Sequence, residues 1–178
     1  MSSYHIDKYD PDWPRLARDE MVRVAAALGL DSGRVEHVGS TAVPGLGAKP
    51  IIDLMAGITG FSLIEDKQPV WNPLRSLGYD HRGIETVPGT LYIRKAEPRR
   101  FNLHMTEYGN EFWISHLLFR DFLRSHAEVA RQYEELKRRL MADLGPEPDQ
   151  AAYNEGKSAF ISGVVARARS EAPKRYLL

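Results

Sequence analysis

The spacing of apolar residues along this chain changes near residue 110, and that change limits the folds that the chain can adopt. Short apolar runs bounded by glycine and proline dominate before this point, and a helical apolar period dominates after it. Strand-type segments followed by helix-type segments are typical of an α+β fold. At a length of 178 residues we expect one domain across residues 1–178, with a sheet core at about 30–107 and a helical part at about 111–168.

The same patterns predict the individual elements. We expect strands at 35–38, 51–58, 90–95 and 100–106, the last two forming an antiparallel hairpin that turns at Glu97-Pro98. We expect helices over 13–28, 69–77, 111–125, from 125 to Gly145-Pro146, and 150–167. Asp12 is predicted to cap the first helix, and Ser125 with Glu128 is predicted to form a capping box for the fourth.

Charge and composition exclude several classes of protein. The 24 lysines and arginines balance 24 acidic residues, which argues against broad capture of nucleic acid or of an anionic membrane. The chain has no cysteine, so thiolate metal sites, disulfides and cysteine nucleophiles are excluded. The first residues lack the apolar core of a signal peptide and no apolar run reaches membrane-spanning length, so we expect a cytoplasmic protein whose partner is a small molecule.

One segment contains the candidate ligand-binding residues, and it begins where a predicted strand ends. Gly39 has no Cβ, so a ligand can approach the backbone there, and Ser40 offers a hydroxyl and an amide to phosphate oxygens. Asp53 lies in an apolar strand, where an ionised carboxylate is costly unless a metal or a cation neutralises it. Lys49 is one candidate for that cation. An ordinary turn at Gly39-Ser40 and a plain Asp53–Lys49 ion pair remain open alternatives.

The stretch from His37 to Asp53 reads His-Val-Gly-Ser-Thr-Ala-Val-Pro-Gly-Leu-Gly-Ala-Lys-Pro-Ile-Ile-Asp. It resembles the hallmark of the GrpB family, a branch of the DNA polymerase beta-like nucleotidyltransferases. Further blocks follow in the family's order over about residues 4–168: Tyr9-x-Pro11-x-Trp13, Leu77-Gly78-Tyr79, the strand with His104, Phe119-Arg120-Asp121, Tyr133-x-x-x-Lys137 and Tyr153-x-x-x-Lys157.

This resemblance implies a small mixed sheet flanked by helices, with a nucleoside triphosphate at Gly39 and Ser40 and a divalent ion, Mg²⁺ or Mn²⁺, at Asp53. The family's wider pattern places a second carboxylate two residues later, where this chain has Met55. A third carboxylate is expected on a neighbouring strand, which offers Asn102 and His104 instead. We therefore expect Asp53 and His104 as catalytic residues and as the ligands of a single metal ion.

Basic side chains complete the expected site. We assign nucleotide binding to Gly39, Ser40, Lys49, Arg120 and Lys157. Arg120 is expected to face the sheet as an anion ligand or an ion-pair partner, with its neighbour Asp121 directed elsewhere. Lys137 is expected to extend to solvent from an apolar helix seam, whereas Lys157 stays open as a triphosphate contact.

Three hypotheses about function follow. In the first, the protein transfers a nucleotidyl group from a nucleoside triphosphate to a small acceptor. In the second, it is a nucleotide-binding or regulatory module that has lost the acidic metal pair, for which Met55 is the best support. A weaker third hypothesis is a hydrolase that uses Asp53 and His104 around one transition metal.

Overall fold

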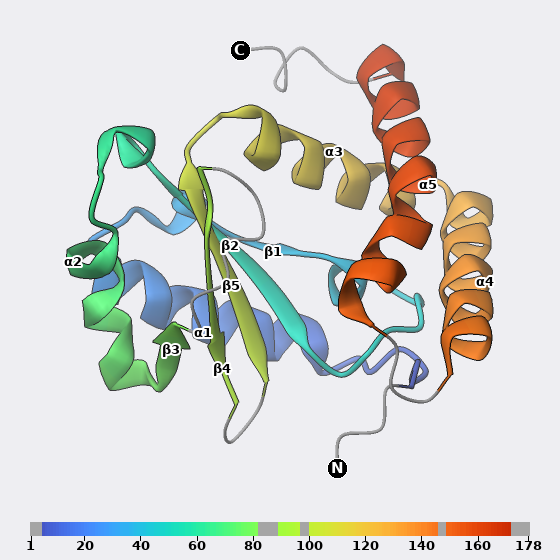
Figure 1. Ribbon diagram of the computed structural model, residues 1–178, viewed down its shortest axis with the longest axis horizontal. Helices are drawn as coiled ribbons and strands as arrows, with labels where there is room; N and C mark the ends of the chain where they lie inside the picture. The colour runs from blue at the N-terminus through green and yellow to red at the C-terminus, as the bar shows by residue number, and fades with distance from the viewer. Residues whose placement is uncertain (1–4, 82–88, 97–99, 146–148, 172–178) are drawn as a thin grey trace.

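A five-stranded sheet forms the centre of the computed structural model, which describes residues 5–81, 89–96, 100–145 and 149–171 (Figure 1). Its strands are β1 (Val35–Val38), β2 (Ile52–Ile58), β3 (Tyr79–His81), β4 (Leu91–Lys95) and β5 (Phe101–Glu107). The spatial order is β1-β2-β5-β4-β3, with β2 and β5 parallel and the other pairs antiparallel. The expected α+β fold with a mixed sheet is confirmed.

The helices lie on both sides of this sheet and at one end of it (Figure 1). They are α1 (Trp13–Leu28), the short α2 (Gln68–Trp71), α3 (Glu111–Ser125), α4 (Ala127–Leu144) and α5 (Gln150–Glu171). In Figure 1, α3 crosses above the sheet and α4 and α5 stand side by side next to it. The change in apolar spacing near residue 110 thus marks the end of the last strand.

Side chains of β2 alternate between the two faces of the sheet, so this strand contributes to two apolar clusters. Leu54 and Ala56 are fully buried in the large core cluster that contains residues of α1. Met55, also fully buried, belongs instead to a small cluster with Trp113 and Leu117 of α3. Successive side chains of a strand point to opposite faces, so Asp53 shares the α3 face with Met55. The predicted site therefore lies on the face that the C-terminal helices cover.

Several local predictions need correction. Asp12 makes no capping hydrogen bond to α1, because its carboxylate accepts hydrogen bonds from the Arg15 guanidinium. Ser125 ends α3 rather than capping α4, since its hydroxyl bonds back to carbonyl oxygens within its own helix. The segment predicted as a helix at 69–77 is α2 followed by a 3-10 helix (Asn72–Leu77).

The sequence patterns did not predict the edge strand β3. Strand β3 has only three residues, too few to show the alternation that reveals a strand. The expected pairing of β4 with β5 is confirmed, in a register from Leu91 opposite Met105 to Lys95 opposite Phe101. The predicted turn at Glu97-Pro98 lies outside the described residues.

A buried ion pair fastens α1 to the sheet. The Lys95 ammonium of β4 donates to a Glu20 carboxylate oxygen of α1 at 2.8 Å, and the two side chains are 8% and 2% exposed. Taking two charges out of water is expensive, so each partner depends on the other for its burial.

Replacing Glu20 by alanine should therefore leave a buried ammonium without its counter-ion. We expect Glu20→Ala to lower the free energy of unfolding by about 3–5 kcal/mol in urea denaturation. Asp19, which pairs with Arg15 across 3.3 Å in solvent, provides the control. Asp19→Ala should cost less than about 1 kcal/mol. Equal losses in the two variants would contradict a fastening role for Glu20.

Candidate functional site

The site begins at Gly39, where β1 turns towards the loop that leads to β2. Gly39 has φ 73° and ψ −171°, a backbone conformation that is essentially limited to glycine. A Cβ atom built on Gly39 would lie 2.6 Å from Oδ2 of Asp53. The absent side chain thus lets the backbone of the turn approach the Asp53 carboxylate, which brings two of the predicted site residues together.

Asp53 is oriented by a chain of two hydrogen bonds across the sheet. Its Oδ1 accepts from Nδ2 of Asn102 at 2.7 Å, and Oδ1 of Asn102 accepts from the Tyr92 hydroxyl at 2.7 Å. Burial raises the pKa of Asp53 to about 6, against the opposing effects of the Asn102 hydrogen bond and of Lys157 and Lys49. Asn102 therefore positions the carboxylate, and Tyr92 fixes which way the Asn102 amide faces.

Lys137 enters this site from α4, contrary to the expectation that it extends to solvent. Its side chain is 3% exposed, and its ammonium donates to Oγ of Ser40 at 3.0 Å and to the carbonyl oxygen of Gly47. Burial lowers its pKa to about 7, and the charges of Lys157 and Arg138 act in the same direction. The signal was present in the sequence, because Lys137 follows the core residue Tyr133 by one helical turn.

Lys49 and Lys157 approach the same carboxylate from the loop and from α5. Each ammonium lies 4.3 Å from the centroid of the Tyr153 ring. Burial lowers the pKa of both lysines, that of Lys157 to about 8, while the charge of Asp53 opposes the shift in each case. Lys49 thus lies beside Asp53, as expected for a cation that neutralises this carboxylate, and Lys157 joins it there; nucleotide contact by both lysines stays a prediction.

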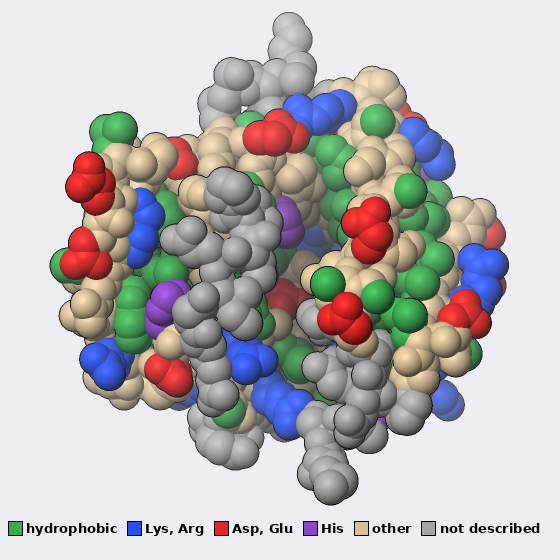
Figure 2. All heavy atoms as spheres, viewed as in Figure 1, with side chains coloured by type: hydrophobic (Ala, Val, Ile, Leu, Met, Phe, Trp, Pro, Cys, Tyr) green, Lys and Arg blue, Asp and Glu red, His purple; other side chains and the backbone are tan. Residues whose placement is uncertain are grey.

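Lys49 and Lys157 thus face the Asp53 carboxylate, and Lys137 faces the Ser40 hydroxyl and the charge of Glu134. The mutual repulsion of the ammonium groups is visible in the pKa values, since Lys49 depresses that of Lys157 and Lys157 depresses that of Lys137. Figure 2 shows this side of the molecule hollowed beside α5, with acidic and basic side chains at the hollow. An excess of partly desolvated positive charge favours an anion with several negative charges.

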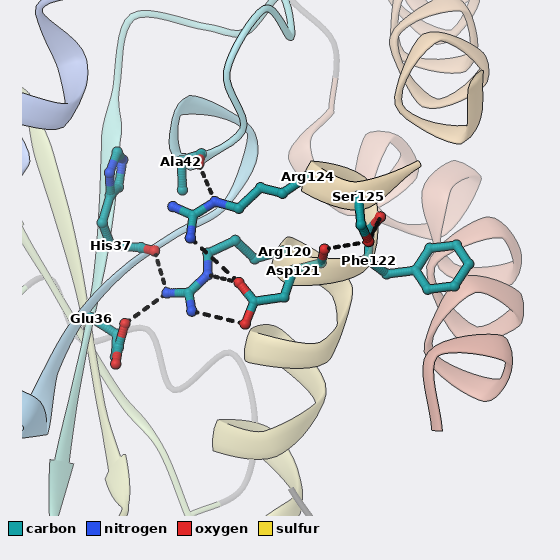
Figure 3. A network of polar contacts seen from close by, with 8 residues as sticks. All are labelled: Glu36, His37, Ala42, Arg120, Asp121, Phe122, Arg124 and Ser125. Atoms are coloured by element: carbon teal, nitrogen blue, oxygen red, sulfur yellow. Dashed lines mark hydrogen bonds and ion pairs between the residues drawn. The ribbon is translucent and has the colours of Figure 1, made fainter. Parts of the chain in front are cut away.

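Arg120 belongs to a neighbouring network rather than to this cluster (Figure 3). Its guanidinium donates to Glu36 of β1 at 2.7 Å, to the His37 carbonyl at 3.0 Å and to both oxygens of Asp121. The expectation that Asp121 points elsewhere is therefore wrong. The long arginine side chain folds back to its neighbour on the helix, and the pair fastens α3 to β1.

Arg124, one turn later on α3, adds a contact that sequence reasoning missed. Its Nε donates to the carbonyl oxygen of Ala42 at 2.9 Å, in the short 3-10 turn (Ser40–Ala42) that follows Gly39. Figure 3 shows Arg124 extending from α3 to this turn above Arg120. The two arginines therefore hold β1 and the Ser40–Ala42 turn in place, and nucleotide contact by Arg120 stays a prediction.

His104 lies on the same face as Asp53 but makes different contacts. It stands opposite Met55 in the parallel register, whereas Asn102 stands opposite Asp53. Its ring contacts Tyr92, Phe112 and His116, and burial lowers its pKa to about 3. The catalytic and metal roles that we assigned to Asp53 and His104 stay predictions.

The donor set does not favour a divalent ion. Across the described ranges, no three histidine or acidic side chains gather as metal ligands would. Met55 lies in an apolar cluster, and the carboxylate that remains, Asp53, already faces Asn102 and the charges of two lysines. A hard cation requires several oxygen ligands and is repelled by neighbouring ammonium groups. The residues present therefore fit an anion better than Mg²⁺ or Mn²⁺.

The described helices include none that is both long enough and apolar enough to cross a membrane.

Comparisons with known proteins agree with the sequence motifs. The model of the GrpB protein family matches residues 3–167. A UPF0157 protein of Streptomyces coelicolor is 36% identical over 163 residues, which are 92% of this chain and 83% of that relative. The UPF0157 protein YqkA of Bacillus subtilis is 32% identical over 164 residues, 90% of this chain and 46% of YqkA, so this chain spans less than half of that protein.

A solved structure is similar along nearly the whole chain. The crystal structure of the conserved protein GrpB from Enterococcus faecalis superposes with a TM-score of 0.76 at 30% identity, covering 94% of this chain and 98% of that one. Together with the match of the family model over most of the chain, these relatives show that the chain belongs to the GrpB family.

Proposed function

We propose that this protein binds the phosphate chain of a nucleoside triphosphate at the cluster of Lys49, Lys137 and Lys157. The observation that carries the proposal is that Lys137 donates to Ser40 while Lys49 and Lys157 lie beside the neighbouring Asp53 carboxylate, with Lys157 close enough to repel the other two. The resemblance of the Gly39-Ser40 turn to that of the nucleotidyltransferases supports the same ligand.

The lysines come from three separate parts of the chain, which favours a built site over a chance cluster. Lys49 lies in the loop before β2, Lys137 on α4 and Lys157 on α5. Burying an ammonium costs free energy, and burial lowers the pKa of all three lysines. A polyphosphate would add negative charge beside all three. Ser40 would then contribute a further hydrogen bond to a phosphate oxygen.

The site supports binding better than two-metal nucleotidyl transfer. Transfer through two metal ions requires clustered carboxylates, and here Asp53 is accompanied by Asn102 and Met55. The ammonium groups would neutralise phosphate charge in place of metal ions. We therefore propose a nucleotide-binding module as the function and expect binding in the absence of a divalent ion.

Removing one ammonium should weaken binding without unfolding the protein. Charge-assisted hydrogen bonds contribute about 1.5–3 kcal/mol, so Lys157→Met should reduce affinity for ATP and for inorganic tripolyphosphate by roughly tenfold or more. Isothermal titration calorimetry with excess chelator measures both affinities. Lys137→Met should have a similar effect, with thermal denaturation reporting whether the loop contact to Gly47 also matters for stability.

Arg139 offers a matched control. It is exposed on α4 two residues after Lys137, so Arg139→Met removes the same charge from the same helix outside the site. Its affinity for tripolyphosphate should stay within about twofold of the unmodified protein, as expected for a screened surface charge. Equal losses in Arg139→Met and Lys157→Met, or no binding of either probe by the unmodified protein, would refute the proposed site.

Binding should also take up protons from solution. The pKa of Lys137 is about 7, set by burial and by the facing charges of Glu134, Lys157 and Arg138. An anion beside an ammonium favours its charged form, so the pKa of Lys137 should rise on binding. At pH 8 the free protein carries mostly neutral Lys137, and the complex should carry the ammonium. Affinity should therefore fall as pH rises from 7 to 9.

Calorimetry in two buffers of different ionisation enthalpy measures that proton uptake directly. At pH 8 the observed enthalpy should differ between the buffers in the sense of net uptake. Lys157 and Asp53, whose pKa values are about 8 and about 6, should also take up protons beside the anion. The share that is lost in Lys137→Met, once the ionisation of tripolyphosphate itself has been subtracted, should shrink at pH 6, where Lys137 is already protonated. Lys137→Met should show a smaller uptake at pH 8 than the unmodified protein. An unchanged uptake in this variant would exclude Lys137 as the group that is protonated.

Restoring a second carboxylate should not restore a metal site. Met55 is fully buried against Val38, Trp113 and Leu117, so Met55→Asp places an acid in an apolar cluster. We expect a loss of at least about 3 kcal/mol in the free energy of unfolding. Met55→Leu, which keeps the volume, should cost less than about 1.5 kcal/mol. A stable Met55→Asp protein that gains Mg²⁺ affinity by titration would instead support the two-metal hypothesis.

A further inference from the structure

We propose that Tyr92, His104, Phe112 and His116 form a subsite for a planar aromatic ring, the base of the nucleotide whose phosphates the lysines hold. We call these four side chains the ring platform. The inference rests on the proposed function, because the lysine cluster defines where the phosphate chain would lie. It adds the chemical class of the group at the other end of the ligand.

The ring platform is a continuous set of neighbouring rings from three elements. The His104 ring centroid lies 5.1 Å from that of Tyr92 on β4, and 5.8 Å and 6.2 Å from those of Phe112 and His116 on α3. Phe112 and His116 are 4.1 Å apart. All four side chains are partly exposed, whereas the neighbouring Trp113 is buried. A partly exposed group of rings provides a surface on which a further ring can stack.

The ring platform adjoins the carboxylate that Lys49 and Lys157 face. The Tyr92 hydroxyl donates to Asn102, and Asn102 donates to Asp53, each across 2.7 Å. The rings come from β4, β5 and α3, and the ammonium groups from the loop before β2, α4 and α5. Asp53 therefore lies between an aromatic surface and a cationic one. A nucleotide has a ring at one end and phosphates at the other, so its base can lie on the aromatic surface and its phosphates on the cationic one.

The chemistry of the ring platform suits a neutral ring and not a phosphate. Nδ1 of His116 lies 2.7 Å from the carbonyl oxygen of Phe112, which requires a proton on Nδ1 and leaves the lone pair on Nε2. Burial lowers the pKa of both histidines, so neither adds positive charge. Nδ1 of His104 is buried and has no hydrogen-bond partner within the described ranges. A buried nitrogen without a hydrogen-bond partner costs free energy. An apolar side chain would therefore fill this position better than His104 if packing were its only role.

The experiment compares ligands with and without the ring on the full chain. Calorimetry measures the affinities of ATP, CTP and inorganic tripolyphosphate. Stacking of a base on aromatic side chains should make at least one nucleotide bind about tenfold more tightly than tripolyphosphate. Phe112→Leu and His116→Leu should each remove most of that advantage and leave the affinity for tripolyphosphate unchanged.

Tyr108 supplies the matched control. It is an exposed ring after the far end of β5, in contact with Trp113 and Arg34, outside the ring platform. Tyr108→Leu should leave the ratio of ATP to tripolyphosphate affinity unaltered. Tyr92→Phe keeps the ring and removes the hydroxyl, so it should keep most of the nucleotide preference. Circular dichroism and thermal denaturation confirm that each variant is folded.

The outcomes separate this inference from the proposed function. Equal affinities for tripolyphosphate and both nucleotides would overturn the ring platform and leave the lysine site standing. Loss of tripolyphosphate binding in Phe112→Leu, in a folded protein, would also overturn it. Binding of neither probe would overturn both proposals. Adenosine binding together with tripolyphosphate, abolished by Phe112→Leu, would support the ring platform as the site of a separate aromatic molecule.

Discussion

The contact between Lys137 and the loop before β2 joins the two halves of this protein. A buried ammonium requires acceptors, and Ser40 and Gly47 supply them from a loop that belongs to the sheet. In return, Glu134 on the same helix accepts from the amide of Gly47 at 2.7 Å. A Cβ at Gly47 would lie 2.7 Å from that carboxylate, so the loop and α4 fit each other closely. The fold and the site therefore share one set of interactions.

Much of the fold could be predicted because its signals are local. The strands and long helices follow from side-chain period and from Gly and Pro boundaries, and α1, β1 and the mixed sheet agree with expectation. The pairing of Ser125 with its own helix and the fold-back of Arg120 onto Asp121 were missed. Both depend on where α3 ends and docks, and a sequence pattern does not record that.

The sequence predicted several residues of the candidate site but not its net charge. Gly39 and Lys49 lie beside Asp53, as the motif suggested, and Lys157, which the sequence left open, joins them from α5. Lys137 was expected in solvent, since a lysine beside an apolar seam usually extends outwards. The tertiary contact of α4 with the loop shows that it turns inwards, and this third ammonium is the reason that we propose an anion and not a metal ion as the ligand.

The order of the elements along the chain has a consequence for synthesis. All five strands of the described residues precede residue 108, whereas Lys137 and Lys157 lie on α4 and α5. Domains can begin to fold while the ribosome is still extending them. A nascent chain that ends after β5 carries the Gly39 turn and Asp53 without the ammonium groups of Lys137 and Lys157. The proposed lysine cluster is therefore assembled only after α5 has been made, and translation that stops after β5 yields a sheet without two of its three ammonium groups.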